Sequence, residues 1–290
     1  MIFSLLNYLT KNSENPVSAF VHPSDEYSLQ KQLNLWKTPT GVGGLELIVE
    51  NALDQRWTPY LEEYVTRWSD GYDSIVPLSL QIDRIEIDPT CKPSLGKLKV
   101  CNGNYGDTGW RGINIALIDD TDQFIRHSVI QFNDYYTNEV DLTPWKAIKY
   151  GDFWGQLNDE SQLKYTMCHE LGHGFGLPHT DENMWNRNTG ECMDFTRFPR
   201  RNLSPGRRNF DRLYQLYGSV PLKRQTNLRH RVPYHRSLSQ EAMAEYEKTI
   251  QNVSEDPSRM ECRVDLANGN HVMIHKLPTL VGMAPLKRRR

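Results

Sequence analysis

The sequence predicts an α+β fold in which helices pack against a twisted mixed sheet. Apolar and polar residues alternate along several short segments, which is the pattern of strands with one buried face. These segments are 45–49, 78–87, 113–118 and 125–132. In longer segments, apolar residues instead recur every three or four positions, which predicts helices with one buried stripe. The helical segments are 58–70, 160–174 and 205–217.

Capping residues mark the ends of these helices. Thr58-Pro59 and Ser204-Pro205 each combine an N-cap side chain with a proline at the first helical position, where the missing N–H costs nothing. Gly71 and Gly218 follow the first and last helices and end them. Residues 102–112 contain four glycines, so we expect a loop or a bulged approach to the strand at 113–118.

Charge is unevenly distributed along the chain. The whole sequence carries 34 Lys+Arg and 36 Asp+Glu. Residues 219–290 hold 13 basic and 7 acidic residues, a net of +6, so residues 1–218 hold the other 21 and 29, a net of −8. The residues that follow Gly218 are also basic and loop-like. Together these observations predict three regions. They are a poorly ordered N-terminal segment at 1–40, a body at 41–218, and a basic extension at 219–290 whose role the sequence does not assign.

Composition also excludes some functions. An acidic body with a basic tail is unlike a nucleic-acid-binding domain, whose folded core usually carries the basic patch, so no nucleic-acid partner is expected. Mean hydropathy is −0.65, and no apolar run reaches the ~18 residues of a membrane-spanning helix. An integral membrane segment is therefore not expected, and the oligomeric state stays open.

The chemistry of the chain is concentrated in residues 169–179, HELGHGFGLPH. His169 and His173 are four residues apart on a predicted helix, so both imidazoles project from one face. Gly176 lets the chain leave the helix sharply, and His179 can then return a third imidazole. Three nitrogen ligands leave an open fourth position, which is the arrangement of one catalytic Zn²⁺. Glu170 lies beside the first ligand and can act as general base.

The alternative without a metal site is a core helix that carries surface histidines. The buried side of this helix is already marked by Leu163, Met167 and Leu171, which leaves the histidines for another purpose. In random order the long motif would occur on the order of 10⁻⁵ times per chain of this composition, and its helical context is present. The zinc interpretation is therefore favoured.

The motif resembles that of the metzincin clan of zinc metalloproteases, in which HExxHxxGxxH is followed by a methionine turn. Residues 191–195, ECMDF, look like that turn, with Met193 as its methionine. The resemblance covers 45–218 and implies that Met193 packs beneath the three imidazoles. It also implies a metzincin-like fold, with an edge strand over the cleft, a zinc helix, and an irregular C-terminal subdomain closed by a final helix. Residues 41–218 would then be the catalytic domain, and the subfamily stays unassigned.

Two further features follow from the resemblance. Astacins and serralysins place a tyrosine two residues after the turn methionine, where this chain has Phe195; a phenol ligand at that place is excluded. In the clan, a strand like 113–118 pairs with extended substrate through its backbone. Gly109, Trp110 and Gly112 would form the approach to it, and the alternative for them is a turn with a packed tryptophan.

The five cysteines bear on localisation. Cys91 and Cys101 bracket a short segment, and a disulfide between them would pin the entry to the glycine-rich loop. Because the zinc helix and the Met-turn meet in metzincins, the resemblance implies that Cys168 and Cys192 can also bridge. The alternative is reduced thiols throughout. Disulfides would indicate an extracellular or secretory protein, although residues 1–9 lack the features of a signal peptide.

These observations favour a zinc-dependent endopeptidase that hydrolyses peptide or protein substrates. A catalytically silent zinc-binding or adhesion protein on the same fold is one alternative; it would typically have lost Glu170 or a histidine, and nothing is lost here. An aminopeptidase with the same zinc chemistry is another.

Overall fold

The computed structural model describes residues 35–38, 43–119, 121–137, 160–184, 186–196, 199–220, 240–253, 261–266 and 269–278. The described residues belong to one compact unit, a mixed α/β fold built on one eight-stranded sheet. The strands are β1 (Leu35–Trp36), β2 (Leu45–Ala52), β3 (Leu78–Arg84), β4 (Leu98–Gly103), β5 (Trp110–Asp119), β6 (Phe124–Asn133), β7 (Glu261–Asp265) and β8 (Asn270–Pro278).

The sheet is mixed in direction. Its order is β3-β2-β4-β6-β5-β8-β7, and β1 pairs with β6 outside this path. The first four strands of the order pair in parallel. Strand β5 is antiparallel to both of its neighbours, and β7 is antiparallel to β8.

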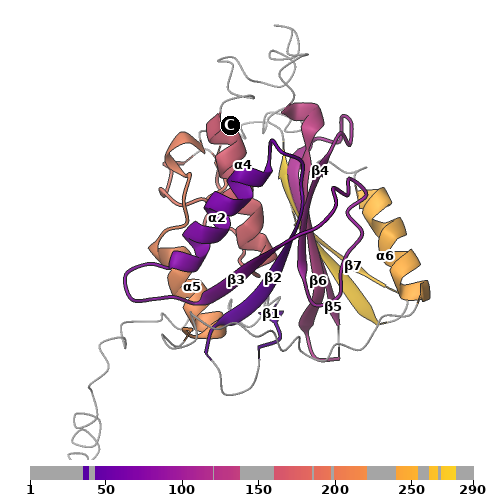
Figure 1. Ribbon diagram of the computed structural model, residues 1–290, viewed down its shortest axis with the longest axis horizontal. Coiled ribbons are helices and arrows are strands. Elements are labelled where there is room, and N and C mark those ends of the chain that lie inside the picture. The colour runs from indigo at the N-terminus through magenta and orange to yellow at the C-terminus, as the bar shows by residue number, and fades with distance from the viewer. Residues whose placement is uncertain are drawn as a thin grey trace, which may run out of the picture. The chain divides into compact units, whose positions relative to one another are not determined.

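Helices cover both faces of the sheet (Figure 1). The four described α-helices are α2 (Thr58–Asp70), α4 (Glu160–Gly174), α5 (Arg207–Tyr217) and α6 (Gln240–Val253). Helices α2, α4 and α5 lie on one face, and α6 lies on the other. The larger buried cluster joins the first three helices to the sheet, and a smaller one lies beneath Tyr246 of α6.

Several predicted boundaries shift. Thr58 is the first residue of α2 rather than its N-cap, which is Trp57; Thr58 Oγ1 donates to the carbonyl of Asp54 at 2.8 Å. Strand β4 was not predicted; it overlaps the glycine-rich segment only at residues 102–103, and five of its six residues are buried. Leu35 and Trp36, expected in a poorly ordered lead, form β1, and Trp36 Nε1 donates to the carbonyl of Gly174 at 2.8 Å. Residues 1–34 and 39–40 of the predicted N-terminal segment lie outside the described residues.

Strand β5 is not the edge strand that the sequence predicted. Strand β8 pairs with it from Trp110↔Pro278 to Asp119↔Asn270, and β7 pairs with the outer side of β8. The backbone of β5 is therefore bonded on both sides, so extended substrate cannot add to it while β8 is in place.

The same pairing crosses the domain boundary predicted at Gly218. Strand β8 lies in one continuous sheet with strands of the body, and Val272 and Ile274 are fully buried. Strands β7 and β8 of 219–290 are thus integrated into the sheet, whereas the sequence suggested an appended extension. The basic composition of 219–290 suggested a separate extension, but most of its charged residues lie outside the short apolar strand β8.

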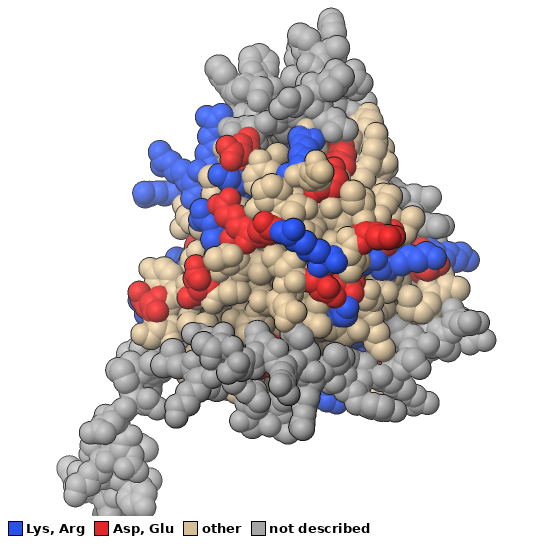
Figure 2. Space-filling view, viewed as in Figure 1, with Lys and Arg blue, Asp and Glu red and all other residues tan. Residues whose placement is uncertain are grey.

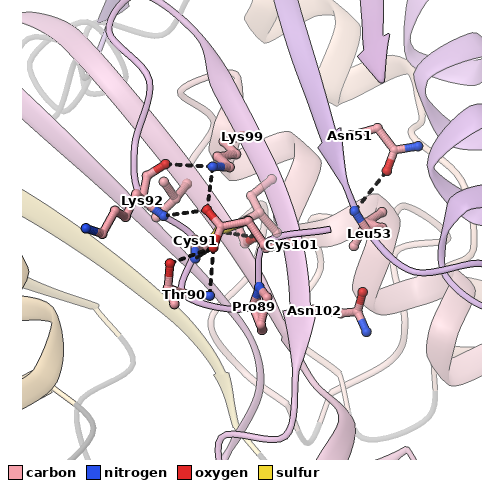
Figure 3. The surroundings of a disulfide bond; sticks show 12 residues. Asn51, Leu53, Pro89, Thr90, Cys91, Lys92, Lys99, Cys101 and Asn102 are labelled. Carbon is pink, nitrogen blue, oxygen red and sulfur yellow. Dashed lines mark hydrogen bonds and ion pairs between the residues drawn. A yellow bond between two sulfur atoms is a disulfide. The ribbon is translucent and has the colours of Figure 1, made fainter. Parts of the chain in front are cut away.

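A disulfide and a carboxylate fix the entry to β4 (Figure 3). Cys91 and Cys101 are bonded, with Cα atoms 5.7 Å apart. Beside them, Asp88 accepts hydrogen bonds from Thr90, from the backbone of Lys92, and from Lys99 Nζ at 2.6 Å. Burial by itself would raise the pKa of Asp88, but the bonds from Lys99 and Thr90 outweigh it and lower the pKa to about 2.

Acidic and basic side chains are interspersed on the face shown in Figure 2, without a large area of one sign. Within the described ranges, no helix has the length and apolar character needed to cross a membrane.

Candidate metal centre

Three imidazoles converge at the C-terminal end of α4. His169 and His173 lie one turn apart on this helix, and His179 follows the turn at Gly176, which has φ 94°. The Nε2 atoms of His169 and His173 are 3.1 Å apart, and they lie 3.1 and 3.2 Å from Nε2 of His179. This is the single group of potential metal ligands found among the described residues.

The other ring nitrogen of each imidazole faces a hydrogen-bond acceptor. Nδ1 of His169 lies 2.7 Å from the carbonyl of Cys192, and Nδ1 of His173 lies 2.8 Å from the carbonyl of Leu177. Nδ1 of His179 lies 2.9 Å from Oε1 of Glu182. Each Nδ1 therefore carries the proton, and each Nε2 directs a lone pair toward the common centre.

Burial keeps the two helical imidazoles neutral. His169 is 0% and His173 3% exposed. Burial is the main cause that lowers the pKa of both rings well below the ordinary value, and neighbouring imidazoles add to it. Neutral imidazole is the form that binds a metal ion.

The donor set fits zinc. Zn–N bonds of about 2.0–2.1 Å in tetrahedral geometry place ligand nitrogens roughly 3.3 Å from one another. The observed separations are close to this value, and no fourth His, Cys, Asp or Glu of the described residues joins the group. The site thus suits a tetrahedral ion with one open position.

Glu170 directly follows His169 on α4 and is fully buried. Neither carboxylate oxygen has a hydrogen-bond partner, and burial raises its pKa well above the ordinary value. Strand β5 leaves room for it at Gly112, where a Cβ atom would come within 2.7 Å of Oε1. Gly112 therefore borders the carboxylate, while the expected backbone pairing with substrate is taken by β8.

Met193 packs directly against α4. A Cβ atom at Gly172 would lie only 2.1 Å from its sulfur, and Met193 is fully buried. The disulfide between Cys168 and Cys192, with Cα atoms 5.9 Å apart, joins the helix to the same turn. The carbonyl of Cys192 also accepts from His169, so this turn both supports and orients the triad.

Of the remaining predicted residues, Gly109 and Trp110 contact tyrosines, whereas Phe195 contacts one of the three imidazoles. Trp110 is buried in the smaller core against Tyr105, with ring centroids 5.4 Å apart, and the backbone N–H of Gly109 donates to Tyr136 Oη at 2.6 Å. These contacts match the alternative of a packed tryptophan. Phe195 packs against the ring of His179 at 5.4 Å.

Sequence reasoning missed two residues of the site. Glu182 holds the third imidazole, and its place three residues after His179 was a usable signal. His275 of β8 stacks on His173, with centroids 4.2 Å apart and planes at 11°. It is 96 residues beyond His179, since 275 − 179 = 96, and no local pattern connects the two.

No protein-family model matches the sequence, and no curated protein does either. Among solved structures, the chain is similar to archaemetzincin from Methanopyrus kandleri, at 17% identity and a TM-score of 0.33. The similarity covers 62% of this chain and 98% of that one. At this level of similarity, function has to be argued from the site itself.

Proposed function

We propose that the protein is a zinc metallopeptidase of the metzincin type. The observation that carries the proposal is one arrangement: three Nε2 atoms face a common centre with every Nδ1 bonded to an acceptor, and Glu170, which follows the first of these histidines on the same helix, is buried with its carboxylate unpartnered. A structural zinc site would have four protein ligands, whereas an open position beside a carboxylate is the pattern of hydrolytic sites.

A bound zinc ion would acidify water and polarise the scissile carbonyl of a peptide. The chain's own residues would do the rest. The three acceptors keep the imidazoles in the ligating tautomer. Glu170 would take the proton from the attacking water and return it to the leaving amine. Its raised pKa moves the carboxyl toward the range in which it can accept and release a proton near neutral pH.

We propose cleavage of internal peptide bonds, which is supported by the resemblance of 169–179 and 191–195 to metzincin endopeptidases. A library of peptides blocked at both ends tests this. Cleavage of blocked peptides supports an endopeptidase, and cleavage only of peptides with a free amino terminus would mean an aminopeptidase. Export to an oxidising compartment is also proposed, and the two disulfides support it.

The decisive test compares metal content and hydrolysis in wild type and Glu170→Gln. The variant should retain one zinc, because the three imidazoles remain, and should lose about 10²–10⁴-fold in turnover because the general base is gone. Glu160→Gln is the matched control, since Glu160 is exposed on the first turn of the same helix. Wild-type protein that binds zinc but hydrolyses no peptide would instead indicate the silent zinc-binding alternative.

A further inference from the structure

Each imidazole of the triad has an aromatic ring beside it, in addition to its acceptor on Nδ1. Tyr165 lies next to His169, with centroids 5.3 Å apart and planes at 47°. Phe195 lies next to His179 at 5.4 Å and 38°. His275 lies next to His173 at 4.2 Å and 11°, so it forms the nearest and the most parallel of the three contacts.

His275 reaches this place through strand pairing. It is opposite Asn114 of β5 and Glu261 of β7, and it is 6% exposed. Its Nδ1 is buried without a hydrogen-bond partner and lies 4.0 Å from Oε1 of Glu261. His275 is not a fourth ligand, because the group of nitrogen atoms within 4.8 Å of one another comprises the other three histidines alone.

The two contacts of His173 restrict different motions of its ring. The bond from Nδ1 to the carbonyl of Leu177 holds one edge of the ring, yet the ring can still tilt about that bond. A parallel ring against its face blocks this tilt, because the tilt would drive the two rings into each other. The direction of the Nε2 lone pair therefore depends on the face contact as well as on the hydrogen bond.

We infer that His275 is a positioning residue of the metal centre, which sets the ring plane of His173 by stacking on it. This inference rests on the proposed function for the identity of the ion. It makes the β7–β8 hairpin a part of the metal site, although the hairpin lies far beyond the HExxHxxGxxH segment in sequence.

The test compares two substitutions of His275 in the full chain. His275→Phe keeps a flat ring, and His275→Leu keeps apolar bulk without one. Zinc affinity is measured by competition with a chelating dye, and the visible spectrum of the Co²⁺ form reports the ligand geometry. Residues that orient metal ligands typically contribute 10–100-fold to affinity, so His275→Leu should weaken zinc binding about tenfold and alter the Co²⁺ spectrum. His275→Phe should stay close to wild type in both measurements.

His271→Leu is the matched control, because His271 lies on the same face of β8 and is also buried. It should leave zinc affinity unchanged. Equal affinities for the Phe and Leu variants, whether tight or weak, would overturn the inference, and so would a His271→Leu variant that loses affinity as much as His275→Leu. If His275→Leu does not fold, His275→Gln takes its place as the ringless variant. Wild-type protein that fails to bind zinc would refute the proposed function instead, so the two failures are distinguishable.

Discussion

Replacing Gly172 by alanine tests how tightly Met193 is held beneath the helix of the triad. A Cβ atom at this position would lie 2.1 Å from Sδ of Met193, 3.1 Å from Cε and 3.2 Å from Cγ. Real Cβ contacts essentially never fall below 3.0 Å, so the methionine or the helix has to move. Met193 is fully buried, and the Cys168–Cys192 disulfide limits the separation of helix and turn.

Two effects of this substitution oppose each other. Alanine is favoured over glycine by about 1 kcal/mol within a helix. Overpacking a filled core costs about 1–3 kcal/mol. Because the new Cβ atom would come so close to Sδ of the buried Met193, we expect a cost in the upper part of that range. We therefore expect Gly172→Ala to lower the free energy of unfolding by about 1–2 kcal/mol.

Urea denaturation measures this loss, and a second substitution identifies its cause. Met193→Ala alone should cost about 2–5 kcal/mol through the cavity it leaves. The double variant should cost less than the sum of the two single variants, because the new methyl group occupies part of that cavity. A Gly172→Ala protein as stable as wild type, or strictly additive effects, would refute the packing argument.

Three other predictions follow from the described contacts. Gly112→Ala should displace the Glu170 carboxylate and reduce kcat by about 10²-fold with zinc content retained; unchanged kcat would contradict the placement of Glu170. Asp88 has a pKa lowered from 3.8 to about 2, so its contribution is complete above pH 3.8 and is lost as pH falls toward 2. Asp88→Asn should therefore cost ~1 kcal/mol at pH 7, after allowance for solvent screening, and progressively less as pH falls through about 2, which urea titrations at pH 7 and at acid pH can check. A chain ending at Gly218 should aggregate and bind zinc poorly, because it exposes the whole edge of β5; a soluble chain of residues 1–218 with wild-type zinc affinity would show that the body is independent.

Local sequence patterns predicted helix α4 and the clustering of the three histidines. Helix α4 spans Glu160–Gly174, as its apolar spacing indicated, and the turn at Gly176 returns His179 to the other two imidazoles. These features could be predicted because helix periodicity, the four-residue spacing of His169 and His173, and the permissiveness of glycine all act over a few residues.

The strand pairing at the edge of β5 could not be predicted from local sequence patterns. The structure contains the β7–β8 hairpin, but nothing in its sequence pattern identified β5 as the strand that pairs with it. Strand pairing between distant segments depends on which backbone edges and apolar faces remain available after the rest of the chain has folded. The sequence of an apolar strand does not indicate with which of several compatible sheet edges it will pair.

The sequence by itself therefore identified the residues that we propose to bind a metal ion and to act as a base: His169, His173, His179 and Glu170. Only the tertiary structure decided what surrounds them. Strand β8 closes the edge of β5 and places His275 against His173. Ligand spacing is a property of one helix and the turn that follows it, whereas the packing around the ligands depends on long-range pairing between strands that are more than 150 residues apart, as at Gly112↔Leu277.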